Sequence, residues 1–213
     1  MSEARSRPRR SSRRGDTRKA LINGAFTLLD GQKSFDGLSQ RELTRYVGIV
    51  PTAFYRHFAS MDELGQALVD EAFRALRQIL EDVRTDVRGS KRPVSTLVRS
   101  LLQHVRAHRS AFRFIAAERF GGAGGIRGAI RREMRLVQAE LAVELARFPY
   151  LKDWSSTDLH MIAALMVNAM VAIVEEVLDR SAADKAAEAE LMALAEKHLR
   201  LIVLGIPHWR SQA

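Results

Sequence analysis

The sequence predicts an all-α protein of about nine helices, in which a small three-helix, homeodomain-like helix–turn–helix domain precedes a larger helical domain. Apolar residues recur at helical spacing through most of the 213 residues, and no segment shows the sustained alternation of a half-buried strand. A tight turn near residue 48 separates two short segments that carry helix start and stop signals. Positive charge is concentrated at the same end of the chain, where residues 1–60 hold 12 Lys and Arg against 5 Asp and Glu.

Residues 1–15 contain six arginines among Ser, Pro and Gly, with too few apolar residues to build a core. We therefore expect a disordered basic arm. Two roles stay open for it at this stage. Either the arm contacts phosphates or enters a minor groove, or it is a tail that only keeps the protein in solution.

The first helix is expected to start at Asp16 or Thr17, both of which are suitable N-cap residues, and to end at Gly31. Phe35 and Leu38 follow it and are expected to pack beneath the next two helices. The buried stripe of this first helix consists of Ala20, Leu21, Ala25, Phe26 and Leu29.

The two short helices that follow form the helix–turn–helix. Ser39 and Glu42 make a capping box that starts the first of them, and Gly48 ends it because glycine adopts the left-handed C′ conformation without a steric cost. Pro51 suits the first turn of the second helix, which we expect to extend to Phe58. The second helix of such a unit enters the DNA major groove with its N-terminal side chains at the base edges.

A second capping box, Ser60 with Glu63, starts a long helix that is expected to extend to about Arg84. The polar segment Asp86–Pro93 is the main internal break. Further helices are expected at about 93–107, 110–120, 126–148, 156–180 and 183–204. The predicted units are the arm at 1–15, a helix–turn–helix domain at 16–75 and a helical effector-binding and dimerisation domain at 76–213.

Charge, cysteine content and hydropathy limit the classes of function. The basic excess at 1–60 indicates a polyanionic partner at that end, because a merely solvated surface would not concentrate charge there. The chain has no cysteine, which fits a reducing cytosol and excludes thiolate chemistry. The N-terminus lacks the apolar segment of a secretory signal, and the longest apolar run, 161–174, is interrupted by Asn168 and is shorter than a membrane span. We expect a cytoplasmic protein without a membrane partner.

The segment Gly48-Ile-Val-Pro-Thr-Ala-Phe-Tyr-Arg-His-Phe58, followed by Asp62-Glu-Leu64, resembles the signature of TetR-type transcriptional repressors. With Ser34-Phe-Asp-Gly-Leu-Ser39 and Met61-Asp-Glu-Leu-Gly65 included, it is most similar to the FabR and DesT branch, which controls unsaturated fatty-acid synthesis and desaturation. The match covers roughly residues 16–80, with a weaker similarity at 111–120. The resemblance implies a homodimer that binds a palindromic operator in double-stranded DNA. It also implies an effector, long-chain acyl-CoA in this branch, that alters operator affinity.

Candidate DNA contacts lie at the start of the first helix and in the helix–turn–helix. Thr52 is suited to a base edge or a phosphate, and Pro51 and Ala53 are suited to a thymine methyl. By resemblance to the family, Tyr55 and His57 contact phosphates; the alternative is that they only pack the small domain. The complete predicted set is Thr17, Ser39, Arg41, Pro51, Thr52, Ala53, Tyr55, Arg56 and His57.

The last two helices offer an apolar surface that is too broad for a simple surface helix. We expect it to form a homodimer interface, since a twofold dimer matches a palindromic operator; the alternative is that part of it belongs to the core of one chain. Its residues are Leu159, Ile162, Ala163, Met166, Ala169, Met170, Ile173 and Val177, followed by Leu191, Leu194, His198, Leu201, Ile202 and Leu204.

Soft apolar side chains in the C-terminal domain are candidates for an effector pocket. On composition alone they fit ordinary core packing, and only the resemblance indicates a pocket for an acyl chain. Cations at the mouth of such a pocket would bind the phosphates of the coenzyme. The candidates are Phe112, Phe114, Phe120, Met134, Met166 and Met170 for the apolar part, with Arg119 and Arg131 as the cations.

No motif indicates an enzyme, a metal centre or a cofactor. The glycine-rich segment 121–125 lacks the preceding strand and the following Lys-Ser/Thr of a phosphate-binding loop. His104 and His108 have the spacing of a metal pair, but no third ligand is nearby in the sequence. Two alternatives to an acyl-CoA-responsive repressor remain: a TetR-type repressor that senses a drug or aromatic metabolite, and a small-molecule-binding protein that does not bind DNA.

Overall fold

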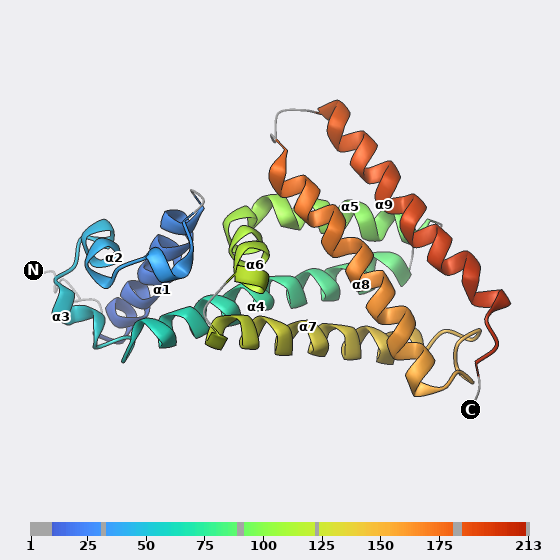
Figure 1. Cartoon of the computed structure of the whole chain (residues 1–213), viewed down its shortest axis with the longest axis horizontal. Coiled ribbons are helices and arrows are strands. Elements are labelled where there is room, and N and C mark those ends of the chain that lie inside the picture. The colour runs from blue at the N-terminus through green and yellow to red at the C-terminus, as the bar shows by residue number, and fades with distance from the viewer. Residues whose placement is uncertain (1–9, 31–32, 89–91, 122–123, 181–184, 212–213) are drawn as a thin grey trace, which may run out of the picture.

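The computed structural model describes residues 10–30, 33–88, 92–121, 124–180 and 185–211. Within these ranges the chain forms nine α-helices and two short 3-10 helices and contains no strand, which confirms the predicted all-α fold. Figure 1 shows a small head at one end of an elongated molecule and a larger helical body at the other.

The head contains α1 (Arg10–Leu29), η1 (Phe35–Gly37), α2 (Gln40–Val47) and α3 (Pro51–Phe54). The long helix α4 (Met61–Arg88) starts in the head and continues through the body (Figure 1). The body adds α5 (Pro93–Ala107), α6 (Arg109–Gly121), α7 (Gly124–Leu145), α8 (Ser156–Asp179), α9 (Lys185–Gly205) and η2 (Ile206–His208).

The local signals for helix ends are confirmed. Ser39 Oγ accepts the Glu42 N–H at 3.2 Å and so caps α2, and Gly48 has a φ of 76° at the end of that helix. Ser60 Oγ accepts the Glu63 N–H at 3.2 Å at the start of α4. These contacts join residues three apart in sequence, so the sequence alone is enough to place them.

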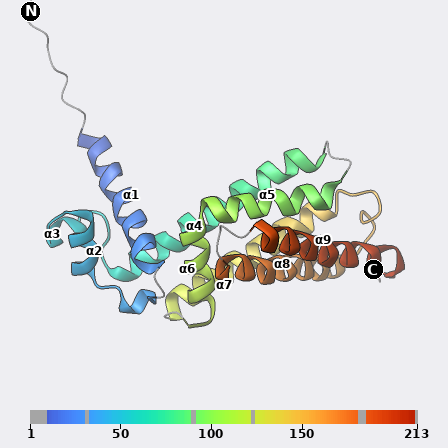
Figure 2. The same cartoon turned by 90° about the horizontal axis from the view of Figure 1, so that it is seen from above.

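Several predicted helix boundaries differ from the structure: α4 extends to Arg88, into the predicted break at 86–93, and α7 ends at Leu145. The two largest differences concern α1 and α3. Helix α1 begins at Arg10, so Asp16 and Thr17 lie inside it and residues 10–15 are helical rather than disordered. Arginine is one of the better helix formers, which allows the helix to extend beyond its buried stripe. Figure 2 shows this N-terminal end of α1 directed away from the body. Residues 1–9 of the predicted arm and the predicted stop at Gly31 lie outside the described residues.

The second prediction to correct is the length of α3. The helix ends at Phe54 and residues 55–57 form a turn, although the Phe58 N–H still donates to Phe54 O at 3.1 Å. The expected face is nevertheless formed, because both Phe54 and Phe58 are buried. The two rings lie 5.7 Å apart and close the core of the head.

One hydrophobic cluster continues from the head into α4, α6 and α7 of the body, which also contains two further clusters. The Phe114 ring on α6 makes edge contacts with Phe26 of α1, at 5.8 Å between ring centres, and with Phe35 of η1, at 6.4 Å. Gly65 of α4 lies so close to α7 that an added Cβ would be 2.7 Å from Ile126 Cδ1. The head is therefore packed directly against α6 and α7 as well as being joined to the body through α4.

Candidate DNA-binding surface and effector cavity

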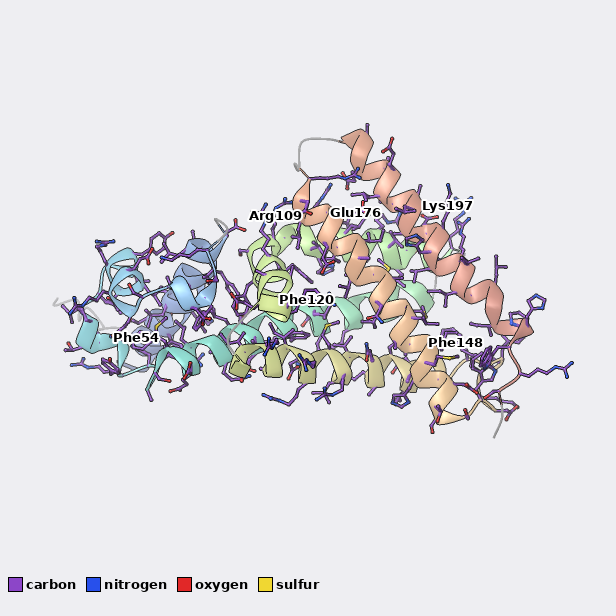
Figure 3. The ribbon with its side chains drawn as sticks, viewed as in Figure 1. Phe54, Arg109, Phe120, Phe148, Glu176 and Lys197 are labelled. Carbon is purple, nitrogen blue, oxygen red and sulfur yellow. The ribbon has the colours of Figure 1, made fainter. Side chains whose placement is uncertain are left out.

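Eight of the nine predicted DNA contacts lie on or next to α2 and α3, at the end of the molecule away from α9 (Figure 1), and the ninth, Thr17, lies on α1. Tyr55 is 61% exposed, while its neighbour Phe54 is buried and anchors the turn from inside the head (Figure 3). Ser39, Arg41, Pro51, Thr52 and Arg56 are also exposed, whereas Thr17, Ala53 and His57 are half-buried.

Gln40 is a residue of this surface that sequence analysis did not single out. Its side-chain oxygen accepts the Tyr55 hydroxyl at 3.2 Å, and its side-chain nitrogen donates to the Pro51 carbonyl at 2.9 Å. One side chain of α2 thus holds both the start of α3 and the aromatic residue that follows it. The Tyr55 contact joins residues 15 positions apart, so no short-range motif indicates it.

Two further contacts hold the head together. Lys33 donates to the Glu42 carboxylate, and this hydrogen bond is the main reason that the pKa of Glu42 lies below its ordinary value. The Arg18 guanidinium lies 4.8 Å from the centre of the Phe58 ring. Lys33 neutralises the Glu42 carboxylate, whereas Arg18 leaves a positive charge beside the core of the head.

A cavity of about 140 Å³ lies within the body, between α4, α5, α6, α7, α8 and α9. Its wall is almost entirely apolar. Five of the predicted effector residues line it, namely Phe112, Arg119, Met134, Met166 and Met170. Helix α4 contributes Phe73 and Leu76 to the wall, so the cavity touches the helix that also starts in the head.

The cavity face of α6 consists of Phe112, Ile115, Ala116 and Arg119, which share one side of the helix because they are three, four or seven residues apart. Arg119 Nη1 lies 3.1 Å from Glu175 Oε1 of α8, and its guanidinium lies 4.5 Å from the centre of the exposed Phe120 ring; Figure 3 labels Phe120. Arg119 and Glu175 both line the cavity, so their ion pair joins α6 to α8 at its wall.

Comparison with protein families identifies both parts of the chain. Residues 21–68 match the model of bacterial regulatory proteins of the tetR family, and residues 91–203 match the tetracyclin repressor-like C-terminal domain. The protein belongs to the TetR family. TetR-family regulators are soluble cytoplasmic proteins that bind DNA operators, typically as dimers, and they are generally not enzymes.

Solved structures show the same fold. A putative transcriptional regulator from Pseudomonas aeruginosa PAO1 has 17% identity and a TM-score of 0.71, with 96% of this chain and 97% of that chain covered. A putative TetR-family regulator from Mesorhizobium loti MAFF303099 has 17% identity and a TM-score of 0.68, with 90% of this chain and 97% of that chain covered. The fatty acid degradation regulator FadR from Bacillus halodurans has 12% identity and a TM-score of 0.66, with 92% of this chain and 97% of that chain covered.

The TetR fold does not bring three of the predicted effector residues to the cavity. Phe114 lies on the opposite face of α6 from Phe112, in the core between head and body. Phe120 is exposed beside Arg119, and Arg131 is exposed on α7. A list of soft apolar and cationic residues cannot separate the two sides of a helix when both sides are apolar.

The predicted dimer face on α8 also needs correction. Leu159, Ile162, Ala163, Ile173 and Val177 are buried within the single chain, so they form its core, as the alternative interpretation held. On α9 the predicted residue Leu191 is also buried, whereas the predicted residues Leu194, Leu201 and Leu204 are exposed. Exposed apolar side chains outside the predicted set on these two helices are Met161 and Leu165 of α8 and Val203 of α9. In the described part of the chain α8 alone is long and apolar enough to cross a membrane by length and composition, a test that core helices also pass.

Proposed function

We propose that the protein is a homodimeric repressor that binds a palindromic operator through α2 and α3 and responds to an apolar effector in the body cavity. The observation that carries this proposal is the composition of the cavity wall. Helices α4 and α6 both line it, and the same two helices pack against the head through Leu64, Leu68 and Phe114.

An effector alters operator affinity only if it binds one arrangement of the two heads better than another. Residues of α4 in the wall, Phe73 and Leu76, lie about one to two turns beyond Leu68, which packs in the core shared with the head. A ligand that displaces them shifts the spacing of the two recognition helices. The fit to half-sites about 34–36 Å apart, or a multiple of it, then changes.

Two classes of effector fit different observations. A cavity of about 140 Å³ with an apolar wall is close to the size that holds benzene, roughly 150 Å³, and is smaller than the roughly 300–1,000 Å³ of pockets for drug-sized ligands. This favours a compact, uncharged aromatic or aliphatic compound. A long-chain acyl-CoA is supported by the resemblance to the FabR and DesT branch and requires the cavity to widen. Met134, Met166 and Met170 are adaptable enough for such repacking.

The decisive experiment is selection of DNA fragments by the purified protein. The selection is run without ligand, with an unsaturated acyl-CoA, with its saturated counterpart and with benzene. A palindrome whose recovery changes oppositely with the two thioesters supports the acyl-CoA sensor, whereas a response to benzene alone supports the compact-ligand sensor. A palindrome that is indifferent to all three retains the DNA-binding regulator and excludes these effectors. If no sequence is enriched, the proposal is wrong.

Two substitutions distinguish a side chain that positions the protein on DNA phosphates from one that reads a base edge. Removal of the hydroxyl in Tyr55→Phe deletes its contact with Gln40 and any phosphate contact, so we expect a similar loss of affinity for all DNA sequences, about 1 kcal/mol. Thr52→Ala should instead change the preference at one base pair of each half-site, by about 1–3 kcal/mol. Both are measured by competition binding against a set of single-base operator variants. A uniform effect of Thr52→Ala would assign it to phosphate positioning.

The basic N-terminus is tested by deletion of residues 2–14, a segment that includes six arginines. If these arginines bind DNA phosphates, the slope of log K against log salt should decrease by about 0.9 for each phosphate that the shortened protein no longer neutralises. The measurement is operator affinity between low and moderate salt, with thermal unfolding of the shortened protein as the control for folding. An unchanged slope would show that the segment is a solubilising tail.

A further inference from the structure

A single buried carboxylate joins the cavity-lining helix to the head. Glu118 of α6 is only 2% exposed, and its Oε1 accepts the backbone N–H of Phe35 at 2.7 Å. Phe35 is the first residue of η1, which connects α1 to α2. The contact spans 83 positions in sequence and ends at the segment that immediately precedes the cap of α2.

The second oxygen of Glu118 has no hydrogen-bond partner within the part of the chain that the structure describes. A buried polar atom without a partner lowers stability, and well-packed apolar residues often replace buried charged groups without loss of stability. Packing alone therefore does not account for a glutamate at this position. A role in selecting one position of the head relative to the body does account for it.

Helix α6 places Glu118 and the cavity on opposite faces. Glu118 and Phe114 are four residues apart and face the head, where Phe114 contacts Phe26 and Phe35. Ile115 and Arg119 are also four residues apart and line the cavity. Since both faces belong to one helix, a movement of the cavity face of α6 also moves the acceptor of the Phe35 N–H.

A second contact from α6 limits how the helix can move. Arg113 Nη1 donates to Asp30 Oδ1 at 2.9 Å, at the end of α1, and Arg113 Nη2 donates to the Leu178 carbonyl of α8 at 3.3 Å. The N-terminal half of α6 is thereby attached both to the end of α1 and to the end of α8, where Arg109 at the start of α6 also donates to the Val177 and Leu178 carbonyls. A displaced α6 would pivot near Arg113, and the end of the helix that carries Glu118 would then move furthest.

We propose that Glu118 is the positioning residue through which occupancy of the cavity alters operator affinity. Its hydrogen bond to Phe35 forms in only one position of the head relative to the body. A ligand that shifts α6 breaks this hydrogen bond and allows the head to adopt a second position. This inference rests on the proposed function, because it requires both an operator and a cavity signal. It concerns only how occupancy of the cavity is transmitted to the head, and it is independent of the identity of the natural effector.

The test uses a double-mutant cycle that needs no natural ligand. Val171→Phe on α8 places a ring in the cavity, since Val171 lines it, and benzene serves as a second probe of occupancy. Both ways of filling the cavity, Val171→Phe and benzene, are tested in the native protein and in two Glu118 variants. Glu118→Leu replaces the acceptor with an apolar side chain of similar size, and Glu118→Gln keeps an oxygen that can accept the Phe35 N–H. Glu144→Leu, which removes a half-buried carboxylate of α7 paired with Arg147, is the matched control.

We expect cavity filling to change the operator Kd of the native protein by at least about 5-fold. The change should fall below about twofold in Glu118→Leu and persist in Glu118→Gln and Glu144→Leu. Amide hydrogen exchange at Phe35 should accelerate in Glu118→Leu while far-UV circular dichroism and Tm remain close to native. Loss of stability without loss of the response would instead indicate a structural role.

Failure of the inference about Glu118 can be distinguished from failure of the proposed function. An equal response to cavity filling in the native protein and in Glu118→Leu overturns the role of Glu118 and leaves the proposed regulator intact. A native protein that binds its operator but ignores both Val171→Phe and benzene overturns the inference and the cavity part of the proposed function together. Absence of any selective DNA binding overturns the proposed function itself.

Discussion

A protein that carries both Leu165→Glu and Leu201→Glu is expected to be a folded monomer that binds the operator at least about 100-fold more weakly than the native protein. Leu165 of α8 is 51% exposed and Leu201 of α9 is 72% exposed in the single chain, so neither substitution should disturb the fold. In a dimer built on these faces, four carboxylates would be buried without partners, at a cost of several kcal/mol for each. Loss of the second head removes the roughly 10²–10⁴-fold gain of bivalent binding.

Sedimentation equilibrium gives the mass of the variant, and titration of a labelled operator gives its affinity. The matched control is Val143→Glu, which adds the same charge at an exposed apolar residue of α7, away from the two proposed interface helices. It should remain dimeric and bind normally. If the double variant is still a dimer and the control is a monomer, the interface lies on α7 instead.

The second large effect is expected from Phe54→Ala, which should remove most of the stability of the head. Phe54 is 1% exposed and lies 5.7 Å from Phe58 and 5.6 Å from Tyr55, measured between ring centres. Truncation of a buried Phe costs about 3–5 kcal/mol, and the four-residue α3 has few other contacts to hold it. Operator binding should be abolished at concentrations where the native protein is saturated.

Tyr55→Ala is the comparison, because Tyr55 is the adjacent aromatic residue and is largely exposed. We expect it to lower operator affinity while the unfolding midpoint in urea changes little. Hydrogen exchange in the peptide 40–58 separates the two cases, since only Phe54→Ala should expose these amides. Equal stability of the two variants would show that α3 is held mainly by its attachment to α2 through Gln40.

The helix boundaries that rest on local chemistry were largely predictable. The hydroxyl of Ser39 and the backbone of Gly48 act on groups within four residues, and α5 begins at Pro93 and ends at Ala107 as expected. The TetR family was predictable as well, because its signature lies in one continuous segment that the tetR family model also covers in large part. Helix α1 differed because it extends past the residues that are suited to cap it, and α3 differed because it ends at Phe54 rather than at Phe58.

The sequence alone therefore determined which segments are helical and that the head is a helix–turn–helix. Only the tertiary structure decided which face of each body helix is buried. Helix α8 is apolar on nearly all sides, so its sequence does not distinguish Ile162, which is buried, from Leu165, which is exposed. The same holds for Phe112 and Phe114, which face the cavity and the head respectively. Which face of a helix is buried depends on contacts between segments that are distant in sequence, such as the hydrogen bond between Glu118 and Phe35. The residue pattern within one helix does not predict these contacts.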